Sequence, residues 1–280
     1  MPRPLCIYHK NCLDGSGAAA VVEKFAPTAE FLPMQYSQPP PTVEGREVYL
    51  VDFAFPIEHM RALKAQATRL TWIDHHSSAE PTWKTLGWGV FDLDECGTSL
   101  TWKTLFPTKP APPIIGYIRD KDLWRWELDD SRAIAAGLSE SFSNSRYKGL
   151  LEVDLAAMAA KGRPLLEARR LRLVEAVKSG VILKDALGVA GLTAMVVNTP
   201  KDQNELGEFI CQPIAEGGLG YDLAIIYYRK QEGPWVHSLR SRVGAADCAA
   251  IAERFGGGGH PCSACFLSPK PILSPGPIIG

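Results

Sequence analysis

The first half of the chain alternates short β-type runs with helical stretches, and this order restricts the fold more than any other feature. Apolar, β-branched runs predict strands over 5–9, 47–53 and 69–76, and helical patterns fill 15–25 and 57–67 between them. A β-α-β-α-β order predicts parallel strands joined by crossover helices. We therefore predict an α/β fold whose N-terminal domain is a parallel sheet with helices on both faces.

The second half becomes helical and then returns to β patterns. Residues 131–180 read as helical with a break at 162–164, and strands are predicted over 188–198, 221–230 and 235–242, followed by a helix at 245–255. These patterns indicate a second, smaller α/β domain. The predicted organisation is a sheet domain at 1–130, a helical connector at 131–184, a second domain at 185–268 and a Pro/Gly-rich tail at 269–280.

Each of the three predicted N-terminal strands delivers side chains that bind metal ions. Because the carboxyl ends of parallel strands meet at one edge of a sheet, these side chains should converge there. An aspartate after a strand often caps the next helix instead, but three sets at equivalent positions favour a shared site. The candidates are His9 and Asp14 after the first strand, Asp52 after the second, and Asp74, His75 and His76 after the third.

The mixture of carboxylates and imidazoles suits Mn²⁺, Co²⁺, Fe²⁺ or Zn²⁺ better than Ca²⁺. The number of ligands predicts two ions about 3.5–4 Å apart, a pair that polarises a phosphoryl oxygen and generates hydroxide at neutral pH. Asp120 and Asp122 follow an apolar run among basic residues, and one of them is expected to complete a metal shell. The alternative for both is a salt-bridged helix end.

A second distinctive segment is RFGGGGHPCSACF at 254–266. Consecutive glycines allow backbone N–H groups to approach an anion closely, and arginine holds phosphate oxygens in a bidentate manner. A flexible loop is the alternative interpretation. The candidate substrate-binding residues are Gly257, Gly258, Gly259 and His260 in this segment, with Ser238 and Arg240 on a neighbouring predicted strand.

Charge and composition exclude several classes of function. The formal net charge is −1, which argues against a protein that coats long duplex nucleic acid by electrostatic attraction. No run approaches the roughly 18 apolar residues of a membrane span. The seven cysteines are an odd, scattered set, which does not suggest a disulfide framework and makes a reducing cytoplasm the simplest expected location.

The Asp74-His75-His76 triplet, the His9…Asp14-Gly15 turn, the strand-end Asp52 and the GGGGH segment together resemble the DHH phosphoesterase superfamily with a C-terminal DHHA1 domain. The resemblance covers roughly 5–126 and 185–267. It implies an active site in an interdomain cleft, with the GGGGH segment and Arg240 holding the substrate. It also implies that His76 and Asp74 act at the substrate phosphate, and that two Mn²⁺ ions, or Mg²⁺ or Co²⁺, are bound by His9, Asp14, Asp52, His75 and Asp120 or Asp122.

The chain departs from this family at its first motif, which usually carries two aspartates spaced D-x-D with glycine after the second. Asp14-Gly15 matches the second aspartate, but Cys12 occupies the earlier position and Asn11 lies beside it. We expect His9 and Asp52 to hold the first ion, with Asn11 or water filling the remaining position.

The resemblance and the near-neutral charge together predict a nanoRNase-like phosphodiesterase or exonuclease acting on short oligonucleotides or dinucleotides. A phosphomonoesterase or polyphosphatase of the same superfamily is the enzymatic alternative. A non-catalytic nucleotide-binding protein with an altered first metal site is the other alternative, and a homodimer is left open.

Overall fold

The computed structural model describes residues 2–36, 38–229 and 232–271. Its contacts divide the chain into two compact units, Met1–Leu166 and Glu167–Gly280. The dividing point lies inside the long helix α7 (Leu155–Lys178). The segment 131–184, which was predicted as a connector, is thus divided between the two units. Its first part belongs to unit 1, and its last residues form strand β6 (Val181–Lys184) of unit 2. None of the helices in the described ranges is both long and apolar enough to cross a membrane.

Unit 1 contains a five-stranded, fully parallel sheet in the order β2-β1-β3-β4-β5. The predicted parallel sheet is therefore confirmed. Strand β2 was not predicted, because Pro33 interrupts its pattern; it pairs only at the edge of the sheet, where a proline is tolerated. The strands are β1 (Leu5–His9), β2 (Glu30–Met34), β3 (Glu47–Val51), β4 (Arg69–Asp74) and β5 (Val90–Phe91).

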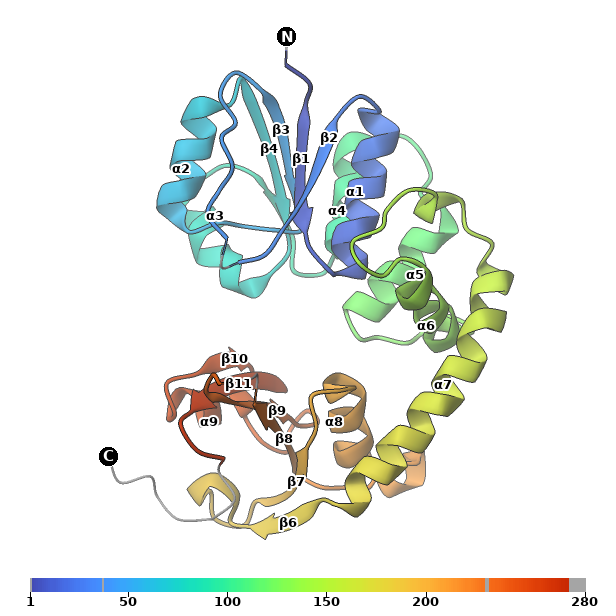
Figure 1. The fold of residues 1–280 in the computed structure, drawn as a ribbon, viewed down its shortest axis with the longest axis vertical. Coiled ribbons are helices and arrows are strands. Elements are labelled where there is room, and N and C mark those ends of the chain that lie inside the picture. Colours follow the sequence, from blue (N-terminus) through green and yellow to red (C-terminus); the bar gives the residue numbers. More distant parts are fainter. Residues whose placement is uncertain (1, 37, 230–231, 272–280) are drawn as a thin grey trace. The chain divides into compact units, whose positions relative to one another are not determined.

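Alternating strand residues build a hydrophobic core on each face of this sheet. Leu5 and Ile7 of β1 face the layer that contains α2 (Ile57–Gln66) and α3 (Glu80–Leu86). Cys6 and Tyr8 face α1 (Leu13–Phe25) and α4 (Gly97–Leu105). Figure 1 shows α2 and α3 on one side of the sheet and α1 and α4 on the other. The helical cover on both faces, predicted from the strand–helix rhythm, is confirmed.

Helices α5 (Pro113–Asp122), α6 (Ser131–Ser141) and the first half of α7 complete unit 1 beside α1. The α6–α7 contact is so close that a Cβ atom on Gly162 would overlap the carbonyl oxygen of Ala133. The predicted break at 162–164 is wrong, since α7 continues through Pro164. This tight packing against α6 explains how the helix tolerates the hydrogen bond that Pro164 removes.

Unit 2 contains a six-stranded mixed sheet in the order β10-β11-β9-β8-β7-β6, in which only β7 and β8 pair in parallel within the described ranges. The predicted strand at 188–198 begins only at Thr193, and the predicted tail lies outside the described residues from 272 onward. The elements are β6 (Val181–Lys184), β7 (Thr193–Asn198), α8 (Gln203–Cys211), β8 (Leu223–Arg229), β9 (Trp235–Arg240), α9 (Cys248–Glu253), β10 (Gly258–His260) and β11 (Ser263–Ser268).

A buried histidine in this sheet makes the stability of unit 2 depend on pH. The ring of His237 is fully buried and stacks on Phe266 with centroids 4.6 Å apart. Burial lowers the pKa of His237 to about 4 in the folded chain. In the unfolded chain the ring has its ordinary pKa of about 6.5. Between these two pH values the unfolded chain therefore binds a proton that the folded chain does not bind.

We therefore expect His237 to reduce the free energy of unfolding by about 2–3 kcal/mol between about pH 7 and about pH 4.5. Urea unfolding at the two pH values checks this. In His237→Phe, the loss of stability between the two pH values should be smaller by that amount. An equal pH dependence in the variant and the wild type would contradict the prediction.

Candidate metal centre

His75 lies among three carboxylates at the carboxyl edge of the first sheet. Its Nε2 is 3.1 Å from Asp52 Oδ1, 3.4 Å from Asp14 Oδ2 and 3.5 Å from Asp122 Oδ2. Asp52 directly follows β3, His75 directly follows β4, and Asp14 lies in the first turn of α1. The parallel sheet thus brings together side chains that are far apart in the sequence.

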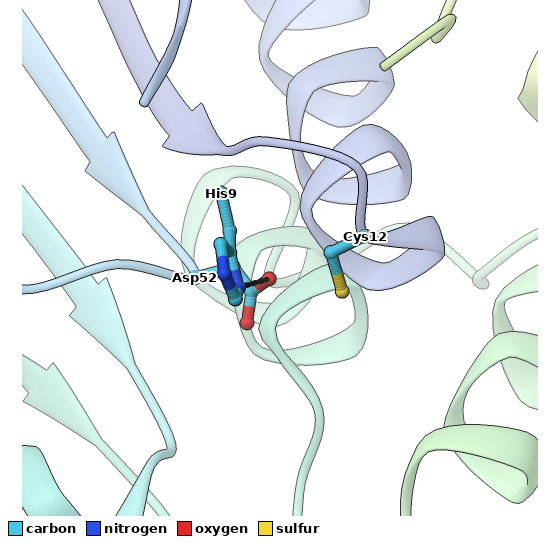
Figure 2. Close-up of side chains that lie close together, drawn as sticks. All are labelled: His9, Cys12 and Asp52. Atoms are coloured by element: carbon cyan, nitrogen blue, oxygen red, sulfur yellow. Dashed lines mark ion pairs between the residues drawn. The ribbon is translucent and has the colours of Figure 1, made fainter. Parts of the chain in front are cut away.

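The site contains three overlapping groups of side chains whose ligand atoms lie within 4.8 Å of one another. Two of them share Asp52, and two share His75. The groups are His9, Cys12 and Asp52, drawn in Figure 2; Asp52, His75 and His76; and Asp14, His75 and Asp122.

The first turn of α4 holds Asp14 in place. The backbone N–H groups of Gly97 and Thr98 donate to the two carboxylate oxygens of Asp14 at 2.5 and 2.8 Å. The Thr98 hydroxyl donates to the backbone carbonyl of Asp14 at 2.8 Å. Neither Gly97 nor Thr98 was a predicted site residue. The available signal was ECGTS at 95–99, a run of small residues that opens a helix after a strand.

Asp74 is fully buried and orients the two histidines that follow it. Its Oδ1 accepts hydrogen bonds from the backbone N–H groups of His75 at 2.8 Å and His76 at 3.2 Å. The same oxygen lies 2.7 Å from Nδ1 of His76. Because Asp74 belongs to none of the three groups found among the described residues, its position suits holding His76 rather than binding an ion.

The structure separates the two aspartates at the end of α5. Asp122 belongs to a ligand group, whereas Asp120 turns to the segment that leads into α6. Its carboxylate accepts hydrogen bonds from the backbone N–H groups of Glu127 at 2.9 Å and Leu128 at 3.4 Å and from the Ser131 hydroxyl. The carboxylate of Asp120, which was proposed from the sequence as an alternative ligand, thus makes hydrogen bonds that hold the segment between α5 and α6 in place.

Substitution of the two aspartates should have opposite effects. Asp120→Ala should lower the free energy of unfolding by about 2–3 kcal/mol, because it leaves the buried Ser131 hydroxyl and two partly buried backbone N–H groups without their charged acceptor. Asp122→Ala should leave stability nearly unchanged and weaken metal affinity on the order of 10–100-fold or more. Urea unfolding and metal titration of both variants check this; loss of metal affinity in Asp120→Ala alone would contradict it.

The electrostatics of the cluster favour a bound cation. Burial, followed by the charges of Asp52 and Asp122, raises the pKa of Asp14 to about 8. Burial opposes the charged form of His75, but its hydrogen bond to Asp52 and the charges of Asp14, Asp52 and Asp122 together outweigh this and raise the pKa to about 10. Asp52 Oδ2 and His9 Nδ1 are buried and lie 3.7 Å apart, and neither has a hydrogen-bond partner within the described ranges. Buried carboxylates that repel one another, and buried ligand atoms without hydrogen bonds, fit divalent metal ions.

The predicted substrate-binding residues of unit 2 lie on β9 and on β10 with its approach, two strands that β11 separates in the sheet. Ser263 of β11 pairs with Arg240 of β9 on one side and with His260 of β10 on the other. Three of the four glycines meet a steric requirement: Gly256 and Gly259 have φ values of +73° and +149°, and a Cβ on Gly257 would overlap the Cys265 carbonyl oxygen. The glycine run therefore forms strand β10 and its approach rather than a flexible loop.

Helix α8 fixes the two polar side chains of β9. Ser238 donates to Gln203 Oε1 at 3.1 Å, and Arg240 donates from Nη2 to Asn204 Oδ1 at 2.6 Å. The aliphatic part of Arg240 lies so close to Gly207 that a Cβ there would overlap its Cγ. Sequence reasoning missed Asn204 and Gly207, because nothing in the sequence of α8 indicates which strand it covers.

Comparison with solved structures identifies the fold. The DHH domain of a protein described as a member of a family of ribosomal proteins matches with a TM-score of 0.62 at 14% identity, over 95% of this chain and 83% of that one. The chain has the DHH-domain fold. The expected architecture of an N-terminal parallel sheet, a helical middle and a C-terminal mixed sheet is thereby confirmed.

Other proteins resemble this DHH-fold chain more weakly. The pGpG-specific phosphodiesterase PggH from Vibrio cholerae matches with a TM-score of 0.47 at 12% identity, over 95% of this chain and 92% of that one. RecJ from Thermus thermophilus, solved with Mn²⁺, matches with a TM-score of 0.49 at 16% identity, over 95% of this chain and 49% of that one.

Sequence comparison adds one curated relative. An uncharacterized protein of Acanthamoeba polyphaga mimivirus is 22% identical over an alignment of 276 positions that covers 91% of this chain. This DHH-fold chain spans 65% of the length of that relative. No protein-family model matches the sequence.

Proposed function

We propose that the protein is a metal-dependent phosphodiesterase that hydrolyses short oligonucleotides or dinucleotides. The observation that carries this proposal is the set of overlapping ligand groups that share Asp52 and His75. Shared ligands suit two neighbouring divalent ions, for which Mn²⁺, Mg²⁺ and Co²⁺ are the candidates. The DHH-domain fold supports the proposed phosphodiesterase activity. The Asp74-His75-His76 triplet, which suggested this family from the sequence, lies at the end of β4, at the edge of the first sheet.

Different residues at this site would bind the two ions. His9 and Asp52 would hold one ion and Asp14, His75 and Asp122 the other. When bound, such a pair supplies hydroxide at neutral pH and stabilises charge on the phosphoryl oxygens.

His76 is placed to act on the phosphate directly. Burial opposes protonation of His76, but the hydrogen bond to Asp74 and the charges of Asp52 and Asp74 together raise its pKa to about 9. With Nδ1 directed to Asp74, Nε2 lies on the opposite edge of the ring. A proton on Nε2 would donate to a phosphate oxygen there.

An aromatic side chain beside the cluster supports a nucleotide substrate. The Tyr36 side chain is 52% exposed, and its ring stacks on Phe53 with centroids 4.8 Å apart. It also meets the edges of His9 at 5.2 Å and His76 at 6.4 Å. A half-exposed ring packed beside the proposed phosphate-binding residues is suited to stack on a base, which polyphosphate lacks. In unit 2, we propose that Arg240, Ser238 and the segment from Gly257 to His260 bind substrate.

Product analysis tests the proposal. The protein is incubated with a 5'-phosphorylated diribonucleotide, or separately with polyphosphate, in Mn²⁺ or in EDTA, and products are separated by ion-exchange chromatography. We expect mononucleotide release that requires Mn²⁺ and disappears in His75→Ala. Release that persists in EDTA or in His75→Ala would refute the metal-dependent mechanism. Hydrolysis of polyphosphate alone would refute the substrate class.

A further inference from the structure

We infer that Cys12 is a metal ligand through its sulfur, so that the first ion site contains a thiolate, an imidazole and a carboxylate. This inference rests on the proposed function, because it assumes that the cluster binds metal ions. It goes further by assigning a donor at the position where the DHH motif usually carries an aspartate. The consequence is a chemical difference between the two ion sites.

The geometry places the sulfur among the ligands. Cys12 Sγ, a ring nitrogen of His9 and a carboxylate oxygen of Asp52 lie within 4.8 Å of one another. Figure 2 shows the Cys12 side chain beside the ion pair of His9 and Asp52. Asp52 is completely buried, and its Oδ2 has no hydrogen-bond partner within the described ranges. A buried carboxylate oxygen of this kind beside a thiol and an imidazole suits binding of a cation.

The alternative donor, Asn11, is engaged elsewhere. Its backbone N–H donates to the Ser145 hydroxyl at 2.8 Å, and that hydroxyl lies 3.4 Å from Asn11 Oδ1. Asn11 also adopts a left-handed backbone with a φ of 57°. The expectation that Asn11 or water fills the first site stays a prediction, but the contact of the Asn11 amide oxygen with Ser145 favours Cys12 as the donor.

A comparison with Cys96 shows that the Cys12 thiol is less engaged with its helix. Both cysteines occupy N-cap positions, Cys12 of α1 and Cys96 of α4. The Cys96 sulfur accepts a hydrogen bond from the Ser99 backbone N–H at 3.4 Å and so caps its helix. Cys12 makes no capping bond of full hydrogen-bond geometry to the described residues of α1. Burial raises the pKa of the Cys12 thiol, and the nearby Gly15 backbone N–H acts in the opposite direction. The helix thus holds this sulfur less firmly than α4 holds that of Cys96.

The donor set determines which ions each site prefers. A thiolate with imidazole and carboxylate favours Zn²⁺ or Co²⁺ over Mn²⁺ and Mg²⁺, because the softer ions bind sulfur more strongly. The second group, Asp14, His75 and Asp122, offers only oxygen and nitrogen and accepts Mn²⁺. The two ions of the pair are therefore expected to differ in identity.

Titration with Co²⁺ tests the assignment without using activity. Cobalt bound to a thiolate absorbs in the near ultraviolet through sulfur-to-metal charge transfer, and bound stoichiometry is measured in parallel by equilibrium dialysis. We expect the band in the wild-type protein and its loss in Cys12→Ser and Cys12→Asp, while both variants still bind Co²⁺ at the other site. Cys12→Asp should also shift the Zn²⁺/Mn²⁺ affinity ratio towards Mn²⁺ by at least about tenfold.

The double variant Cys262→Ser/Cys265→Ser is the matched control, because these are the other two cysteines of the chain that are not buried, and it should keep the band. Cobalt binding with no band in the wild type, or a band that survives in Cys12→Ser, would overturn the assignment of Cys12 and leave the proposed function standing. No cobalt binding in any protein would overturn both. Circular dichroism of each variant confirms that it is folded.

Discussion

Replacing Asp52 with asparagine should abolish phosphodiester hydrolysis and empty the metal centre. Asp52 belongs to two of the three ligand groups, is fully buried and lies 3.1 Å from Nε2 of His75. Loss of its charge should reduce kcat/KM by at least about 10²–10³-fold, the scale observed when a preorganised charge is removed from a reacting centre. Kinetics with a diribonucleotide and metal analysis of the dialysed protein measure the two effects.

Asparagine is the appropriate replacement because Asp52 has a φ of 54°, a left-handed conformation that asparagine also tolerates. The variant therefore keeps the shape and backbone of the site and changes only charge. Asp129→Asn, on the exposed surface of the same unit, is the matched control and should behave as the wild type. A fully metallated, active Asp52→Asn protein would show that the shared carboxylate is not required.

The substitution Gly97→Ala, which adds a single methyl group, should disrupt the candidate metal centre by displacing its ligands. A Cβ at this position would lie 2.6 Å from Asp52 Cβ and 2.9 Å from Asp14 Oδ2. Both neighbours are buried at the junction of the sheet with α1 and α4, so they have little room to move. We expect Gly97→Ala to lose about 1–3 kcal/mol of stability through overpacking. We also expect metal affinity to fall at least about tenfold, because two ligands are displaced.

Gly116→Ala is the control for Gly97→Ala, since Gly116 is also helical but a Cβ there would meet only Leu128 Cδ1, at an ordinary 3.7 Å, among the described residues. This variant should be as stable as the wild type or more stable by up to about 1 kcal/mol, because alanine favours helix. Thermal unfolding measures the stability of both variants, and metal titration measures their metal affinity. If Gly97→Ala behaves like Gly116→Ala, the close approach of α4 to the ligands is not functionally important.

The arrangement of strands around His9, Asp52 and His75 was predictable from the sequence because it depends on local patterns. Apolar runs of strand length, each followed by a helix, force parallel crossovers, and parallel strands end at one edge. The side chain that follows each strand is then placed by chain position alone. The same reasoning failed at β2, where Pro33 interrupted the pattern, and at Pro164, where tertiary packing maintains the helix.

Tertiary contacts decided the details of the site. Asp120 and Asp122 are two residues apart at a helix end, so their side chains point about 200° apart around the axis, and only packing shows which one meets His75. The same holds for Asn11 and Cys12, where the distant Ser145 contacts Asn11 and the Cys12 sulfur lies beside His9 and Asp52. Gly97 and Thr98 reach Asp14 across more than 80 residues. Local sequence determines periodicity and strand ends, whereas these choices depend on contacts between segments that only the folded chain brings together.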